Sequence, residues 1–407
     1  MRKLFATILI CGSTAGFAQT NNFWTKKSDF GAFKRERAVG FAVNGKGYVG
    51  TGIDTTETVR KDWWEYDATL DTWTQKANLP GSVRRNAVGF PIGNKGYVGM
   101  GIDSTEAFTG TILNDFWEYN PGTNTWTQKA NYPGSAGIGV YFATGFELDG
   151  KGFVCCGKIG ADLYTDEFWE YKPLSDTWTK RADFPGGERY QLCSFVVNGK
   201  AYVGLGAEYN TYLRDIWEYQ TATDTWIQKS DFAGGDRGSV TTFVISQRAF
   251  VCLGVDGGLK KDLWEYDPFQ DSWTARASYD GSERKGAVGF TINGKGYAGT
   301  GDGYSGKKAS MYEYTPVAIV GVEENASAST IEVFPNPVYD HFNIVSTQRD
   351  VTTYLLYSLD GRCVKTIFAG NENVLRVERN ELASGVYVLS GVNEQGTMIV
   401  SQKVIFQ

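Results

Sequence analysis

One phrase recurs six times along this 407-residue chain: a segment ending in glycine, then Trp-Glu-Tyr, then a turn and a second tryptophan. The Trp-Glu-Tyr segments start 47 to 53 residues apart, which is the repeat length of propeller blades rather than of helical solenoids. They begin at Trp64, Trp117, Trp169, Trp217 and Trp264, and in degenerate form at Tyr312. The second tryptophans are Trp24, Trp73, Trp126, Trp178, Trp226 and Trp273. This repeat limits the architecture more than any other feature.

Each unit divides into four short strands. In the first unit, Ala38–Val43 leads into Asn44-Gly45, a pair that tolerates the positive φ of a two-residue hairpin turn. A glycine-ending strand follows, then the Trp-Glu-Tyr strand and a last strand such as Trp73–Ala77, with period-two alternation. We therefore predict an all-β chain that folds as a ring of six four-stranded blades.

The two ends of the repeat array predict how the ring closes. An orphan fourth strand at Trp24–Lys27 precedes the first unit, whereas the sixth unit stops near Thr315-Pro316 without one. Pairing the orphan strand with the last three strands completes six blades and removes the exposed edges. All 12 tryptophans lie in the repeats, and we interpret them as packing between blades.

These features resemble kelch repeats over roughly residues 21–316. The glycine-ending strand, the Trp-x-Tyr strand and the Thr-x-x-Trp exit from the turn carry the resemblance. The double glycine of the kelch signature is Gly-x-Gly in most repeats here, and Cys155 and Cys252 take the place of its first glycine. The resemblance implies a six-bladed β-propeller of the galactose oxidase-like or N-acetylneuraminate epimerase-like kind.

The start of the chain has the pattern of an export signal. A basic Met1–Lys3, an apolar Leu4–Ile10 and small residues before Gln19 are typical of a secretory signal peptide spanning residues 1–18. We expect the propeller to occupy residues 19–316 and a linker to occupy residues 317–330.

The last segment, residues 331–407, is predicted to be a small β-sandwich. Val333–Pro337, Tyr357–Arg362 and Leu382–Val388 resemble, in order, three motifs of the C-terminal sorting domain of the type IX secretion system of Gram-negative bacteria. The resemblance implies that the secretion machinery is a partner and that the protein is secreted or attached at the outer-membrane surface. The tail is usually removed in that family. A β-sandwich appendage without a sorting role is the alternative.

Composition excludes several kinds of partner. The 40 Lys and Arg against 46 Asp and Glu give a net charge of −6 without a basic patch, so we expect no nucleic-acid partner. No run of eighteen apolar residues is present, so we expect no membrane span. After the signal peptide, the cysteines are odd in number and scattered, which argues against a disulfide framework. They are Cys155, Cys156, Cys193, Cys252 and Cys363.

Several catalytic chemistries are excluded from the propeller, because the single histidine, His341, lies in the tail. The copper oxidases that share kelch repeats need two histidines and a cross-linked tyrosine, and a Ser-His-Asp triad also needs a histidine. The Ser-x-Asp-x-Gly-x-x-Trp box of sialidases is absent, as are calcium loops and zinc-type Cys/His spacings. We therefore expect no cofactor and no metal.

Aligning the repeats reveals two recurring charged sets. Arginine stands six residues before the first-strand phenylalanine in five units, and a carboxylate follows the second-strand glycine in five. Alternate loops of an antiparallel meander emerge on the same face, so both sets point to one mouth of the ring. The predicted ligand-binding residues are Arg35, Arg84, Arg189, Arg237, Arg284, Asp54, Asp103, Glu208, Asp256 and Asp302.

Two interpretations of these charges stay open. Guanidinium forks could bind the carboxylates or hydroxyls of a ligand, or arginines and carboxylates could satisfy each other at every blade junction as scaffolding. Departures from the repeat indicate where a ligand would bind. Val140 replaces arginine in the third unit, which gains three residues around Ala136–Ala143. Of the six units, the second has the longest loop after its second strand, Ile102–Asp115.

Two classes of function follow. The first is an exported, surface-attached or secreted module that binds a glycan or a protein without catalysis. The alternative is a metal-independent sugar mutarotase or epimerase resembling N-acetylneuraminate epimerase, which needs only an acid/base pair. No catalytic motif of those epimerases can be placed on residues of this chain, and whether it is an enzyme stays open. A purely structural role in surface adhesion is not separated from the first class by sequence.

Overall fold

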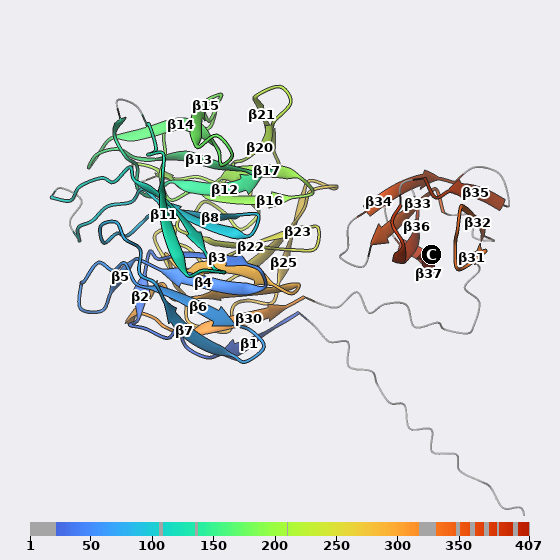
Figure 1. Ribbon diagram of the computed structural model, residues 1–407, viewed down its shortest axis with the longest axis horizontal. Coiled ribbons are helices and arrows are strands. Elements are labelled where there is room, and N and C mark those ends of the chain that lie inside the picture. The colour runs from blue at the N-terminus through green and yellow to red at the C-terminus, as the bar shows by residue number, and fades with distance from the viewer. Residues whose placement is uncertain are drawn as a thin grey trace, which may run out of the picture.

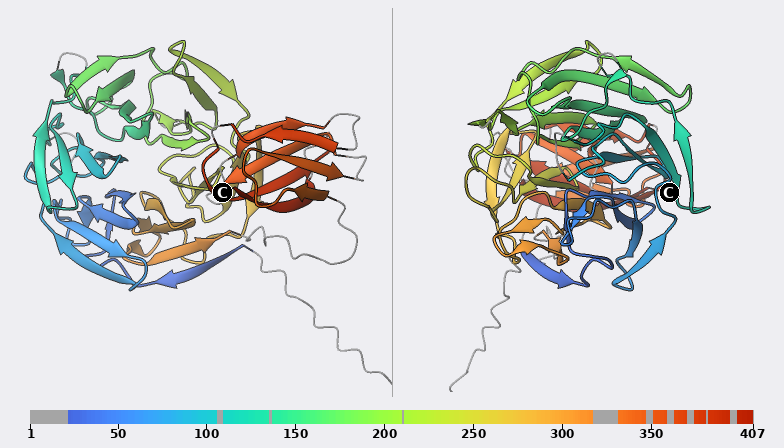
Figure 2. Two further views of the ribbon diagram at one scale, coloured as in Figure 1. Left: turned by 45° about the vertical axis from the view of Figure 1, so that its right-hand side comes forward. Right: turned by 90° about the vertical axis from the view of Figure 1, so that its left-hand side faces the viewer.

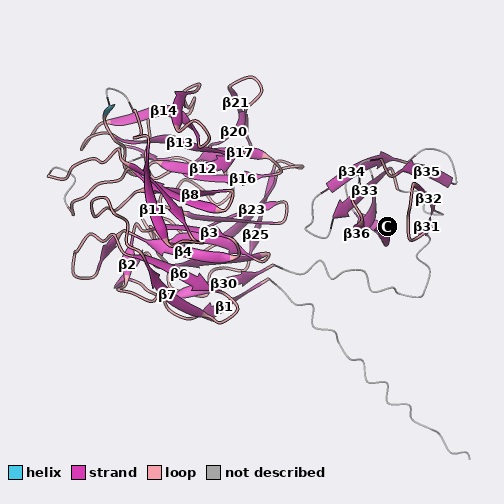
Figure 3. Ribbon diagram, in the orientation of Figure 1, coloured by secondary structure: helices cyan, strands magenta, loops and turns pink. Residues whose placement is uncertain are grey.

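The structure is a computed structural model, and it describes residues 22–105, 109–134, 137–209, 211–316, 331–346, 351–358, 363–369, 374–380, 382–393 and 398–406. The predicted signal peptide and the predicted linker at 317–330 lie outside these ranges. Apart from a single 3₁₀ turn at Gly137, the regular structure of the described residues consists of β-strands, as Figure 3 shows. The all-β prediction is confirmed.

Six four-stranded antiparallel sheets follow one another along the chain, and the first strand named in each blade below is the innermost. Blade 1 contains β3 (Val39–Val43), β4 (Lys46–Gly50), β6 (Trp63–Asp67) and β7 (Thr72–Lys76). Blade 2 contains β8 (Val88–Ile92), β9 (Lys95–Gly99), β10 (Phe116–Asn120) and β11 (Thr125–Lys129). Blade 3 contains β12 (Thr144–Leu148), β13 (Lys151–Lys158), β14 (Tyr164–Lys172) and β15 (Thr177–Lys180).

The second half of the ring repeats this order. Blade 4 contains β16 (Cys193–Val197), β17 (Lys200–Gly204), β20 (Ile216–Gln220) and β21 (Thr225–Lys229). Blade 5 contains β22 (Thr241–Ile245), β23 (Arg248–Cys252), β24 (Leu263–Asp267) and β25 (Ser272–Arg276). Blade 6 contains β26 (Val288–Ile292), β27 (Lys295–Gly299), β30 (Met311–Thr315) and β1 (Phe23–Lys27). Three two-stranded ribbons decorate the loops: β2 (Arg35–Glu36) with β5 (Ile53–Asp54), β18 (Ala207–Glu208) with β19 (Thr211–Tyr212), and β28 (Asp302–Gly303) with β29 (Gly306–Lys307).

The ring closes through its N-terminal strand, as predicted. Strand β1 pairs antiparallel with β30 and places Trp24 opposite Tyr314, so the blue first strand lies beside the orange last blade in Figure 2. Trp24 Nε1 donates to Ala277 O at 3.0 Å. The closure removes the free edge that β30 would otherwise expose.

The innermost strands pack closely around the ring axis, and this explains the glycine in their recurring Val-Gly-Phe pattern. At Gly40 in β3, a Cβ atom would lie 2.6 Å from Val288 Cβ in β26. That distance is far below van der Waals contact, so a side chain at this position would force blades 1 and 6 apart.

The fourth-strand tryptophans join neighbouring blades. Each indole N–H donates to a carbonyl in the segment that leaves the preceding blade, as Trp126 Nε1 does to Ala77 O at 2.8 Å. The other five bonds run from Trp24, Trp73, Trp178, Trp226 and Trp273. The structural interpretation of these tryptophans therefore agrees with the packing.

The two faces of the ring differ. We call the side with Arg35–Arg37 and the β4–β6 connection at 51–62 the loop face; it lies on the left in Figure 1, near the labels β2 and β5, and faces the viewer in the right-hand view of Figure 2. We call the opposite side, with the Asn44-Gly45 hairpin turn, the turn face. Strand β30 runs from the loop face to the turn face, where it ends. Its antiparallel partner β1 runs the other way and therefore begins on the turn face. The chain therefore leaves the ring toward its tail on the side opposite the predicted ligand-binding loops.

The tail forms a β-sandwich of its own. One sheet has the order β31 (Ile331–Phe334), β32 (His341–Ser346), β35 (Val374–Glu378), and the other has the order β34 (Cys363–Phe368), β33 (Thr353–Ser358), β36 (Gly385–Val392), β37 (Met398–Phe406). Val338, Phe342, Leu356, Leu389 and Phe406 are buried in its core. The predicted small C-terminal β-sandwich is confirmed.

Candidate functional site

In four blades the predicted arginine forms a two-armed ion pair with an acid of its own blade. Arg84 Nη1 and Nη2 donate to Asp115 Oδ1 and Oδ2 at 2.8 and 2.7 Å. Trp117 Nε1 donates to the same carboxylate at 2.6 Å. The other pairs are Arg35–Asp62, Arg189–Asp215 and Arg237–Asp262. All five arginines are at most 2% exposed, so their guanidinium groups lie beneath the loop face rather than on it.

Each arginine also holds the bend that ends the second strand. Arg35 Nη1 donates to Thr51 O at 2.8 Å, and Thr51 lies at φ 61° between two glycines. The N–H of Gly52, in turn, donates to the carbonyl of Arg84 in the next blade at 2.8 Å. Equivalent side-chain bonds run from Arg84, Arg189, Arg237 and Arg284 to Met100, Leu205, Leu253 and Thr300. These contacts favour scaffolding at the blade junction for the arginines.

Two blades depart from this pattern. In blade 3, where Val140 replaces the arginine, the acid is Glu167, which pairs with Lys180 at 3.4 Å. In blade 6 the acid is replaced by Ser310, whose Oγ accepts from Arg284 Nη1 at 3.1 Å. In blade 3 both the arginine position and the acid position change, whereas in blade 6 the arginine stays and a serine hydroxyl replaces the carboxylate as its acceptor.

Among the described residues, no side-chain hydrogen bond or ion pair joins the predicted carboxylates to these arginines. Asp54 is buried and bonds to Thr56, Thr58 and Arg60. Burial raises the pKa of the Asp54 carboxyl, but these hydrogen bonds outweigh it and lower the pKa to about 2. The other four carboxylates, Asp103, Glu208, Asp256 and Asp302, keep exposed surface on the loop face. Contact between any of the ten residues and a ligand stays a prediction.

A closed ring of backbone hydrogen bonds encircles the axis on the loop face. Its members lie two residues after each arginine position, and each N–H donates to the carbonyl of the neighbouring blade's member at 2.8 to 3.2 Å. All six have positive φ, between 53° and 61°. We call this set the axial ring: Arg37, Asn86, Phe142, Gln191, Ser239 and Gly286.

Two axial-ring side chains carry polar atoms without a hydrogen-bond partner among the described residues. They are Asn86 Nδ2 and Gln191 Oε1, and Asn86 is only 7% exposed. Next to them, the buried carboxylate of Glu36 lies 3.3 Å from Arg37 Nε. An unsatisfied buried polar atom costs about 1–3 kcal/mol, so such atoms call for an explanation beyond folding.

Blades 3 and 4 add an aromatic cluster beside the axial ring. Lys158 Nζ lies 5.9, 5.1 and 4.9 Å from the ring centroids of Tyr141, Tyr164 and Tyr190. Burial lowers the pKa of Lys158, and its Nζ takes part in no ion pair within the described part of the chain. Tyr190 also contacts Phe142 of the axial ring, with 5.8 Å between centroids. The asymmetry that the sequence places in the third unit is therefore accompanied by this lysine and its tyrosines.

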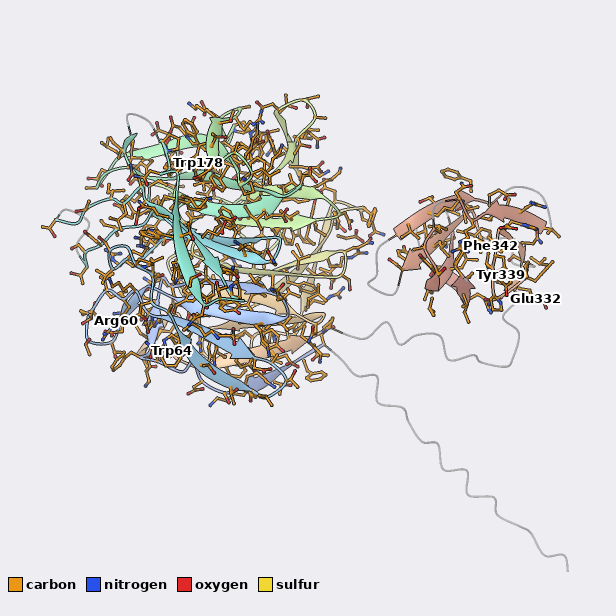
Figure 4. The ribbon with its side chains drawn as sticks, in the orientation of Figure 1. Arg60, Trp64, Trp178, Glu332, Tyr339 and Phe342 are labelled. Carbon is orange, nitrogen blue, oxygen red and sulfur yellow. The ribbon has the colours of Figure 1, made fainter. Side chains whose placement is uncertain are left out.

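A groove of about 740 Å³ opens on blade 1. Phe33, Arg60, Lys61 and Trp64 contribute to its walls, and Gln75 and Asn78 to its rim; Figure 4 labels Arg60 and Trp64. Its described lining comes from the connections and outer strands β6 and β7, and includes no residue of the innermost strands β3 and β8. The groove is therefore peripheral to the axial ring. Sequence reasoning missed it.

Comparison with known proteins identifies the tail. Residues 332–407 match the family described as the secretion system C-terminal sorting domain. The sorting domain indicates that the protein is secreted or attached at the cell surface or outer membrane, and that the secretion machinery is a partner. No curated protein matches the chain in sequence.

The ring has a solved structural counterpart. The chain aligns with a structure titled "Structure of YjhT" with a TM-score of 0.60 and 16% sequence identity, covering 71% of this chain and 97% of that chain. At this identity the likeness concerns the fold, and it agrees with the predicted propeller. Within the described residues, no helix is long and apolar enough to cross a membrane, and no group of three His, Cys, Asp or Glu side chains is arranged to hold a metal ion.

Proposed function

We propose that the protein is a non-catalytic binding module, delivered to the cell exterior by its sorting domain, which binds a glycan or protein ligand on the loop face of the propeller. The observation that carries this proposal is the pair of unpartnered polar atoms on the axial ring, Asn86 Nδ2 and Gln191 Oε1. One is a donor and the other an acceptor, as a ligand rich in hydroxyl groups requires.

The surroundings of the axial ring fit such a ligand. Phe142, Tyr190 and the exposed Tyr209 offer aromatic surface, and Lys158 offers a cation that is not committed to a carboxylate. The exposed carboxylates Asp256 and Glu208 belong to loops of the same face. Binding sites commonly combine apolar walls with a few placed polar groups.

The position of the tail supports the same proposal. The chain leaves the propeller from the turn face, where β30 ends. A propeller held at a surface through the chain end that follows β30 would then keep the loop face free for a ligand in solution or on another cell.

The alternative is a metal-independent sugar mutarotase or epimerase. The observation that favours it is Lys158, whose pKa is lowered by burial, together with the buried Glu36 carboxylate beside the axial ring. A base and an acid beside one ligand site are what such proton transfers need.

One pair of experiments separates these functions. The full chain is applied to a glycan array, and in parallel it is added to anomerically pure sugars whose anomer exchange is followed by NMR. Binding without faster exchange supports the binding module. Faster exchange that is lost in Lys158→Met supports the enzyme.

A further inference from the structure

The groove on blade 1 contains the clearest departure from the repeat on the loop face. Two residues before the arginine, the other arginine-bearing blades have Ser82, Gly187, Gly235 and Ser282, whereas blade 1 has Phe33. Phe33 is 54% exposed. The blade junction therefore forms without a side chain larger than serine at this position, and exposing a phenyl ring does not help the chain to fold.

The charge of the residue after Phe33 also differs from that in the other blades. Lys34 precedes the arginine of blade 1, where blades 4 to 6 have Glu188, Asp236 and Glu283. Arg60 lies over the Phe33 ring with its Cζ 4.7 Å from the centroid, and its charge is matched by Asp54. Asp62 is likewise matched by Arg35. Lys61 donates to Gly81 O at 3.2 Å and is in no ion pair of the described residues, so the lining of the groove carries an excess positive charge in a chain of net charge −6.

The remaining polar groups of the groove are amides. Gln75 and Asn78 lie exposed at its rim, and Gln75 Nε2 donates to Asn78 Oδ1 at 3.4 Å. Trp64 supplies a second aromatic wall, with its indole N–H directed to Asp62 at 2.9 Å. Aromatic faces, amides and one uncommitted cation together suit a chain of pyranose rings that carry carboxylates, because the rings stack, the hydroxyls bond to amides and the carboxylate pairs with lysine.

We propose that this groove is a second binding site, separate from the axial ring, for an acidic oligosaccharide of uronate type. A sugar ring stacks on Phe33, Gln75 and Asn78 bond to its hydroxyls, and Lys61 pairs with a uronate carboxylate. The site does not depend on the function of the axial ring.

The test measures calorimetric binding of tetragalacturonate and of neutral cellotetraose to the full chain. The expected result is binding of tetragalacturonate that weakens with added salt and falls at least tenfold in Phe33→Ser and in Lys61→Gln. Phe33→Trp should retain binding, since it keeps an aromatic face. Phe33→Ser restores the residue of blades 2 and 6, so its melting temperature should stay close to that of the parent.

A matched control is Phe269→Ser, which removes another exposed phenylalanine, 67% exposed, with an arginine 6.0 Å from its ring. It lies in a β24–β25 turn on the turn face and should leave binding unchanged. The proposal is overturned if neither oligosaccharide binds, if both bind equally, or if Phe33→Ser binds like the parent. Gln191→Met, on the axial ring, should not alter tetragalacturonate binding, so failure at the axial ring and failure at the groove are distinguishable.

Discussion

Arg84 and Asp115 meet through two hydrogen bonds, one to each carboxylate oxygen, of 2.8 and 2.7 Å. The guanidinium side chain is fully buried and the carboxylate side chain is 19% exposed. The planar fork of arginine matches a carboxylate in this geometry. Because the same arginine also bonds to the Met100 carbonyl at 3.1 Å, one side chain fixes the first, second and third strands of its blade relative to each other.

The first prediction compares the two kinds of junction arginine. Arg84→Ala leaves the Asp115 carboxylate without its partner and should cost about 3 kcal/mol of unfolding free energy, the low end for a broken buried pair, since the carboxylate is partly exposed. Arg284→Ala leaves only neutral acceptors, the hydroxyls of Ser282 and Ser310 and nearby backbone carbonyls, without this donor and should cost about 1–2 kcal/mol. Urea unfolding of both variants measures the difference. Equal losses would contradict the ion-pair account.

A second prediction concerns the stability of the fold at acidic pH. Burial raises the pKa of Asp115 and of Asp262, but the arginine bonds outweigh it and lower both values. A carboxylate with a lowered pKa in the folded state contributes stability above its unfolded pKa, and this contribution is lost as pH falls below about 4. Unfolding free energies measured from pH 6 to pH 3 should therefore fall, and Asp115→Asn should show a shallower fall. Parallel curves for variant and parent would count against the prediction.

The third prediction tests ring closure. Deleting residues 19–30 removes β1 and exposes the edge of β30, so the truncated protein should aggregate. Trp24→Ala keeps the strand but loses the indole bond to Ala277 and the packing on Phe243 and Tyr279, at a cost of about 3–5 kcal/mol. Light scattering and thermal melting check both variants. A truncated chain that stays monomeric with unchanged melting would refute the closure.

The fourth prediction concerns processing. The signal peptide should be cut between Ala18 and Gln19, and the sorting domain should direct export and then be removed near Ile331. Mass spectrometry of the exported protein reads both ends. An intact chain retained in the periplasm of a competent host would speak against this route.

Much of the fold follows from the repeat. The spacing of Trp-Glu-Tyr, the Asn44-Gly45 turn and the orphan strand at Trp24 predict the blades and their closure, because each is a local signal repeated in phase. The axial ring is different. Arg37, Phe142 and Gln191 adopt positive φ, which their side chains do not favour, so only the closed cycle of inter-blade bonds imposes this conformation.

The partners of the arginines could have been predicted, but were not. The acid two residues before each Trp-Glu-Tyr tryptophan recurs as Asp62, Asp115, Asp215 and Asp262, and its change to Ser310 or to Glu167 accompanies a changed partner or the loss of the arginine. The prediction instead took the acids that follow the second strand, because they also lie at the loop face. Of these, Asp54 pairs with Arg60 and not with Arg35. The groove at Phe33 had a sequence signal as well, a large residue where other blades have glycine or serine.

The central claim is tested most directly by an affinity measurement on two variants, Gln191→Met and Arg237→Ala. The ligand is the glycan that the parent protein binds most tightly on an array. Methionine keeps the length of Gln191 and removes the unpartnered Oε1, so the fold should melt as before while affinity falls about tenfold, the loss expected for one hydrogen bond. Arg237→Ala should lower the melting temperature and leave the affinity of the remaining folded protein nearly unchanged. The opposite pattern, with binding lost in Arg237→Ala at unchanged stability and kept in Gln191→Met, would contradict the account.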